Sequence, residues 1–157
     1  MDNETLFFNS LRIALQLAQA EAFGTYYSGF YAFEKWMLFL EPFCLSPGKA
    51  TFDKIEENLT ILNTLADSRH AAYEYLLSNE DYLQPENFKR IIENYRNENM
   101  ILLNAKNNIL PGFGSGPEEW TGDTLCGQMK ALKQLLEIEK DTVKIIENEL
   151  QKRDSMT

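Results

Sequence analysis

The stretch GTYYSGFYAFEKWMLFLEPF, residues 24–43, decides the fold because aromatic rings crowd it at helical spacing. On a wheel of 100° per residue the rings cover almost the whole circumference, and only a narrow strip near Ser28 and Lys35 is polar. A helix that is apolar on all sides is buried on all sides, whereas a bundle helix normally keeps one face in water. We therefore expect core on one side of this segment and, on the other, cover from a loop, a second subunit or another protein.

A membrane span is the competing interpretation of the same stretch, since a span needs about 20 mostly apolar residues. Glu34, Lys35 and Glu41 interrupt the run, and Pro42 directly follows Glu41. Each central charge costs roughly 2.5–3.5 kcal/mol on insertion scales. Together these charges outweigh most of the aromatic gain, and we predict no membrane segment.

Apolar residues recur at helical spacing along nearly the whole chain, which predicts an all-α fold. Segments rich in Gly, Pro and polar residues at 45–50, 78–87 and 110–127 separate helices expected at about 4–44, 48–78, 85–109 and 123–152. The first helix is either continuous or broken near Gly24 or Gly29. A chain of 157 residues is expected to form one domain, 1–157. Because the first two connections are short, we expect an up-and-down antiparallel bundle of four main helices.

Charge and cysteine content restrict the class of protein. The net charge is -9 and the basic residues are scattered, which argues against nucleic acid and against an anionic membrane surface as partners. Cys44 and Cys126 lack the spacing of a metal site or of a disulfide framework. We expect both cysteines to be reduced. Since no secretory signal is visible at the N-terminus, we also expect a cytoplasmic protein.

The motifs of common helical enzymes are missing from the sequence. The single histidine, His70, excludes the paired motifs of di-iron bundles and the usual zinc sites, so we expect no metal and no cofactor. The Gly-rich loop at 110–127 lacks the Lys-Ser/Thr of a phosphate-binding loop and is interpreted as a connector. Its Phe113 and Trp120 are large for a tether, and they either cover the aromatic helix or join an interface.

Two charged residues occupy positions where a helical core normally has leucine. In the second helix Arg69 falls in the apolar series Phe52, Ile55, Leu59, Leu62, Ala66, Tyr73 and Leu76. In the fourth helix Glu139 falls in the series Leu125, Met129, Leu132, Leu136, Val143, Ile146 and Leu150. The two signs are opposite, which favours an ion pair between the helices.

Treating each connection as a hairpin puts these residues at one level of the bundle. The predicted layer contains Arg69, Glu139, Tyr95 and either Tyr26 or Tyr27, and His70 lies at its edge. A buried ion pair needs further hydrogen bonds, which tyrosine hydroxyls supply. The layer either fixes the register of the helices, which we favour, or forms a pocket where Arg69 binds an anion or Glu139 acts on a ligand.

These observations predict a non-enzymatic interaction module that binds another protein or itself, as immunity proteins, inhibitors, chaperones and assembly subunits do. The candidate interface residues are Tyr31, Trp36, Phe39, Phe43, Phe113 and Trp120. The alternative is a small-molecule-binding or catalytic bundle centred on Arg69 and Glu139. A partner surface leaves rings exposed, whereas a ligand pocket encloses them around the charged pair.

Overall fold

The computed structural model describes residues 2–46, 51–109 and 121–155. Within these ranges the chain forms five long helices, and the all-α class is confirmed. The elements are α1 (Asn3–Gln19), β1 (Ala22–Phe23), β2 (Tyr26–Tyr27), α2 (Gly29–Leu45), α3 (Phe52–Leu77), the 3-10 turn η2 (Glu80–Tyr82), α4 (Pro85–Ile109) and α5 (Gly122–Asp154).

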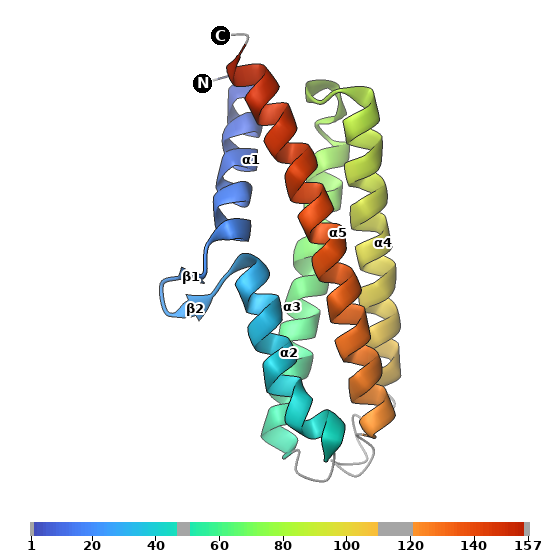
Figure 1. Cartoon of the computed structure of the whole chain (residues 1–157). Coiled ribbons are helices and arrows are strands. Elements are labelled where there is room, and N and C mark those ends of the chain that lie inside the picture. The colour runs from blue at the N-terminus through green and yellow to red at the C-terminus, as the bar shows by residue number, and fades with distance from the viewer. Residues whose placement is uncertain (1, 47–50, 110–120, 156–157) are drawn as a thin grey trace.

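The helices form an elongated bundle with both termini at the same end (Figure 1). α1 and α2 follow each other along one side, α3 returns, α4 runs back, and α5 returns beside them. α5 packs against α1, α2 and α4, whereas α3 packs mainly against α4. The backbones of α2 and α3 make little close contact, and large side chains occupy part of the space between these two helices. Among the described residues, no helix combines the length and apolar character that a membrane span requires.

The predicted first helix, 4–44, is two helices joined by a β-hairpin, so the described residues form five α-helices. β1 and β2 pair antiparallel, with Ala22 opposite Tyr27. Gly24 and Gly29 have φ values of 64° and 52°, a left-handed conformation that glycine adopts without a Cβ penalty. The Ser28 hydroxyl donates a hydrogen bond of 2.8 Å to the Leu17 carbonyl and ties the hairpin to the end of α1. The alternative of a break near the two glycines is therefore correct.

The two glycines offer a matched test of this junction. A Cβ on Gly29 would lie 1.9 Å from the carbonyl oxygen of Ala18, whereas a Cβ on Gly24 would meet nothing within 4 Å. Gly24→Ala should cost about 1–2 kcal/mol for its backbone conformation alone. Gly29→Ala should cost about 2 kcal/mol more, because the backbone of α1 must move. Urea unfolding of the two variants measures the difference, and equal losses would show that α1 and α2 do not meet closely here.

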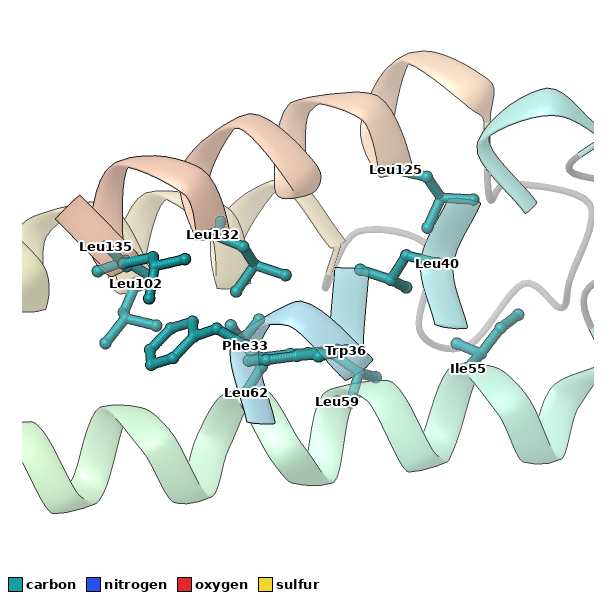
Figure 2. Close-up of a cluster of buried hydrophobic side chains, with 12 residues drawn as sticks. Phe33, Trp36, Leu40, Ile55, Leu59, Leu62, Leu102, Leu125, Leu132 and Leu135 are labelled. Atoms are coloured by element: carbon teal, nitrogen blue, oxygen red, sulfur yellow. The ribbon is translucent and has the colours of Figure 1, made fainter. Parts of the chain in front are cut away.

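The core consists of two clusters along the length of the bundle. In the first, Phe33, Trp36 and Leu40 of α2 reach toward leucines of α3 and α5 (Figure 2). In the second, Phe7, Phe8 and Leu11 of α1 pack on the halves of α3, α4 and α5 that lie toward the chain termini in the bundle. The aromatic stretch is thus only partly buried. Its hairpin rings lie outside both clusters and are exposed, so within the described residues nothing supplies the cover that was expected for the second side of this stretch.

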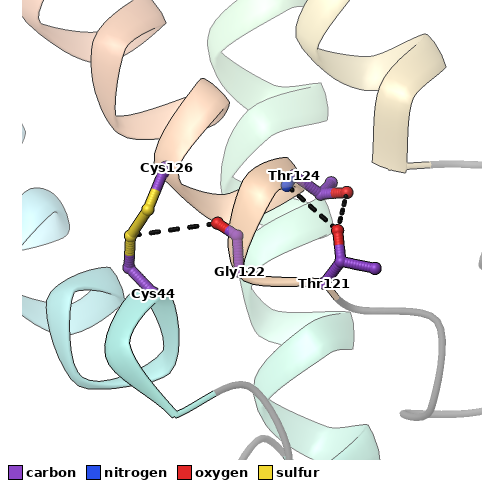
Figure 3. The surroundings of a disulfide bond; sticks show 5 residues. All are labelled: Cys44, Thr121, Gly122, Thr124 and Cys126. Carbon is purple, nitrogen blue, oxygen red and sulfur yellow. Dashed lines mark hydrogen bonds between the residues drawn. A yellow bond between two sulfur atoms is a disulfide. The ribbon is translucent and has the colours of Figure 1, made fainter.

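A disulfide joins the end of α2 to the first turns of α5 (Figure 3). Cys44 and Cys126 are bonded with their Cα atoms 5.5 Å apart, across a sequence separation of 82 residues. The expectation that both cysteines are reduced is therefore wrong. The bond forms because α2 ends, and α5 begins, at the same end of the bundle.

Candidate functional site

Three helices bring together a cluster of buried charges between the two apolar clusters. Arg69 of α3 places its Nε 3.0 Å from Oε2 of Glu98 on α4. Its Nη2 forms an ion pair with Oε1 of Glu139 on α5. The predicted pairing of Arg69 with Glu139 is present. We call Arg69, Glu98, Glu139 and the adjacent Tyr95 the polar cluster.

Glu98 is the member of the polar cluster that sequence analysis missed. Its side chain is only 1 % exposed, less than those of Glu139 (8 %) and Arg69 (21 %). The signal was present in the sequence, because Glu98 continues the apolar series of the third helix. That series has alternating steps of four and three: Ile91, Tyr95, Glu98, Leu102 and Ala105. The rule that singled out Arg69 applies equally to this position.

Burial and charge set the protonation of the cluster. Burial, with the nearby Glu139 carboxylate, raises the pKa of Glu98 to about 9, although Arg69 opposes this shift. Glu98 therefore holds a proton at neutral pH. Burial tends to lower the pKa of Arg69, but Glu139 and Glu98 outweigh it and raise that pKa, so the guanidinium stays charged. Burial also raises the pKa of the Tyr95 phenol, which stays neutral.

The cluster is held by charge more than by hydrogen bonds. Within the described residues, four of its buried atoms have no well-aligned hydrogen-bond partner: Arg69 Nε, both carboxyl oxygens of Glu98, and Glu139 Oε1. Buried polar groups are normally satisfied, and those that are not need an explanation. Three of these atoms, Arg69 Nε, Glu98 Oε2 and Glu139 Oε1, belong to the two ion pairs, so attraction between charges replaces aligned hydrogen bonds there.

A cavity of about 290 Å³ lies over the cluster, where α1 ends and α2 begins. Arg69, Tyr95 and Glu139 line it from one side. The remaining lining is mostly small or apolar and comes from the α1–α2 junction and from α5: Ala14, Leu15, Leu17, Ala18, Ser28, Gly29, Thr142, Val143 and Ile146. We call this space the polar cavity.

Two residues predicted for this layer lie elsewhere. Tyr26 is on β2, 77 % exposed, because the hairpin carries it out of the helical register that the prediction assumed. His70 is exposed on α3, next to Arg69 in sequence but turned toward solvent. Neither belongs to the polar cluster, and those assignments are wrong.

A second hollow, of about 460 Å³, separates the hairpin and α2 from α3. We call it the aromatic groove. Its walls are mostly apolar, and Lys35 and Glu57 are the charged residues among them. The full lining is Tyr26, Tyr27, Ala32, Phe33, Lys35, Trp36, Phe39, Glu57, Ile61 and Leu65. The ammonium of Lys35 lies 4.7 Å from the centroid of the Tyr31 ring, a cation–π contact at the edge of the groove.

Trp36, predicted as an interface residue, belongs mainly to the core. It is 7 % exposed, and its indole N–H donates a 2.7 Å hydrogen bond to the Asn58 side chain. The amides of Asn58 and Gln128 exchange two further hydrogen bonds of 2.9 Å. This buried polar network fixes how α2, α3 and α5 meet and leaves little of Trp36 for a partner.

The other predicted interface residues divide into two groups. Tyr31, Phe39 and Phe43 are half-buried on α2, and their role in an interface stays a prediction. Phe113 and Trp120 lie outside the described residues. The most exposed rings in the described part of the chain belong to the hairpin, which contributes Phe23, Tyr26 and Tyr27.

Comparison of the chain with protein families, curated proteins and solved structures finds no match. The polar cluster, the polar cavity and the aromatic groove are the features of the described residues that bear on function.

Proposed function

We propose that this chain is a non-enzymatic protein-binding module whose aromatic groove receives an apolar segment of a partner protein. The exposure of the hairpin rings carries this proposal: Phe23 is 69 % exposed, Tyr26 77 % and Tyr27 61 %. A soluble domain gains nothing in stability from rings held in water, whereas aromatic side chains are enriched in interfaces. The tyrosines line the aromatic groove and do not enclose the charged pair, which favours a partner surface over a ligand pocket.

The shape of the groove favours a helical partner segment. Its long walls are α2 and α3, and an amphipathic helix places apolar residues into such a hydrophobic groove at steps of three and four. Phe33 and Phe39 offer apolar contacts on one wall, and Ile61 and Leu65 offer them on the other. A second copy of this chain is the competing occupant. On this proposal α1 and α2 together serve as one broken helix of an up-and-down four-helix bundle.

Removing the hairpin rings should abolish capture of the partner. Tyr26→Ser with Tyr27→Ser removes two exposed anchors, and loss of such hot-spot residues costs about 2 kcal/mol or roughly 30-fold in affinity. The control is Leu103→Ser, an exposed apolar residue on α4, 54 % exposed and away from the groove. Affinity capture from the native cell with all three proteins, followed by mass spectrometry, makes the comparison.

The expected result is a protein retained by the wild type and by the control but lost from the groove variant. An isolated apolar segment of the captured protein should then bind the wild-type chain with measurable affinity. Sedimentation equilibrium at micromolar concentration tests whether a second copy of this chain occupies the groove. A dimer formed through the groove should dissociate when Tyr26 and Tyr27 are both replaced by serine. The proposal is contradicted if the chain is a monomer and the wild type and the groove variant capture the same proteins.

A cytoplasmic location stays a prediction, and the disulfide argues against it. Such bonds persist in oxidising compartments and are rare where thiols are kept reduced. The pairing of Cys44 with Cys126 therefore favours a partner met in an oxidising environment.

A further inference from the structure

The polar cavity has no part in the proposed interaction, and its lining combines the buried charges of Arg69 and Glu139 with small and apolar residues. We propose that it binds a small organic cation, a primary ammonium or an amidinium on an apolar body, through the carboxylate of Glu139. This adds a ligand site to the interaction module and rests on different residues from those of the aromatic groove.

The charge of the cluster selects a cation. One guanidinium, Arg69, faces two carboxyl groups, and at neutral pH the proton on Glu98 balances the charge; once Glu98 ionises, the cluster carries one excess negative charge. An anion entering the cavity would compete with Glu98 and Glu139 for Arg69 and would meet Glu139 itself. A cation beside Glu139, which lines the cavity, can take the place of the proton on Glu98, because Arg69 is then free to pair with an ionised Glu98.

The walls of the cavity select a compact apolar body. Ala14 and Ala18 are small residues on the last turns of α1, and Val143 and Ile146 face them from α5. Tyr95 and Ser28 also line the space, and a hydroxyl of either residue can accept a hydrogen bond from an ammonium group. A volume of about 290 Å³ is at the lower end of the range for ligand pockets, which suits a molecule with a single ring.

Binding of a cation should release a proton. The titratable groups that face Glu98 are Arg69 from α3, Tyr95 on its own helix and Glu139 from α5. α1 and α2 contribute no titratable side chain to the cavity lining. A ligand cation replaces the positive charge that the proton on Glu98 supplies, so Glu98 ionises. The affinity should therefore increase as the pH rises toward about 9, by up to about tenfold per pH unit.

The test uses benzylamine as the cation, with benzyl alcohol and benzoate as its neutral and anionic counterparts. In ¹⁵N–¹H spectra of the full chain, benzylamine should shift the amide signals of Ala14, Ala18 and Gly29 to saturation, and the counterparts should not. Calorimetry in buffers of different ionisation enthalpy should show protons released on binding. Glu139→Gln should weaken binding at least about tenfold, since the charge of the acceptor is lost. The matched control is Glu137→Gln, an exposed position on the same helix with a side chain 74 % exposed.

Each alternative outcome overturns the proposal. Benzoate binding as tightly as benzylamine would make the cavity an anion site of Arg69. Equal binding of benzyl alcohol would make it an apolar hollow in which charge has no part. No saturable shift at tens of millimolar benzylamine would leave the cluster with a purely structural role. If Glu139→Gln does not fold, the proton release and the pH dependence of the wild type still decide, since binding without either contradicts the proposed coupling.

Discussion

Replacing Arg69 with methionine is expected to lower the free energy of unfolding by about 3–5 kcal/mol, because removal of one partner strands the other buried charges. In this variant Glu98 and Glu139 face each other in the core without a cation. The Glu139→Leu variant should lose a similar amount, since the buried guanidinium then loses the carboxylate that pairs with its Nη2. Urea unfolding measures each loss. Arg96→Met, an exposed change on α4, should stay within about 0.5 kcal/mol of the wild type.

Combining Arg69→Met with Glu139→Leu should recover much of the loss, because a matched apolar pair is often neutral or stabilising in a core. Glu98 can stay protonated in the double variant, so no buried charge is left unpaired. The four proteins close a double-mutant cycle that isolates the interaction. Additive losses would show that the two residues do not stabilise each other, and near-neutral single changes would show that the cluster is solvated.

The proton on Glu98 adds a pH dependence to this cycle. The pKa of Glu98 rises from 4.5 to about 9 on folding, so between these values the folded chain holds a proton that the unfolded chain has lost. This contribution to stability is complete below about pH 4.5 and is lost as the pH rises toward about 9. The Glu98→Gln variant should lack this component, and its unfolding free energy should fall less steeply with pH than that of the wild type.

The pair of Arg69 and Glu139 could be predicted because both residues fall at the helical spacing of the apolar residues around them. Arg69 and Glu139 interrupt apolar series with steps of three and four, and the short connections set the levels of consecutive helices. The helix Pro85–Ile109 was predicted with the same bounds, since a proline at the first helical position marks its start. Glu98 follows the same periodicity as Arg69 and was within reach of the same argument.

The hairpin could not be predicted from periodicity. The rings on both sides of Ser28 fit one helical wheel, and nothing in their spacing shows that Tyr26 and Tyr27 leave the helix. The break depends on Gly24 and Gly29 adopting left-handed conformations, which glycine permits but does not require. Much of the apolar surface that the helical wheel left without cover belongs to rings that are not in a helix.

The disulfide depends on contacts between helices that are not consecutive. α2 and α5 are neighbours around the bundle. Treating each connection as a hairpin, however, sets only the levels of helices that are joined by one connection. Cys44 and Cys126 are 82 residues apart, and their meeting requires both α2 to end and α5 to begin at one level. Sequence spacing alone therefore supported the reduced state.

Removing this disulfide should destabilise the fold by about 4–5 kcal/mol, since cross-linking a loop of this length restricts the unfolded chain by that amount in the chain-entropy account. Cys44→Ser with Cys126→Ser, or the wild type in reductant, should unfold at clearly lower urea concentration than the oxidised wild type. The matched control is the double serine variant in reductant, whose midpoint should not move.

Two reactive thiols in the folded, unreduced protein would contradict the pairing. An unchanged midpoint on reduction would show that the bond, even if formed, adds nothing to stability. The result also bears on where the protein works. A fold that loses about 4–5 kcal/mol of a typical 5–15 kcal/mol on reduction would be marginal among reduced thiols, and an oxidising compartment would follow. A fold indifferent to reduction would leave the cytoplasmic prediction standing.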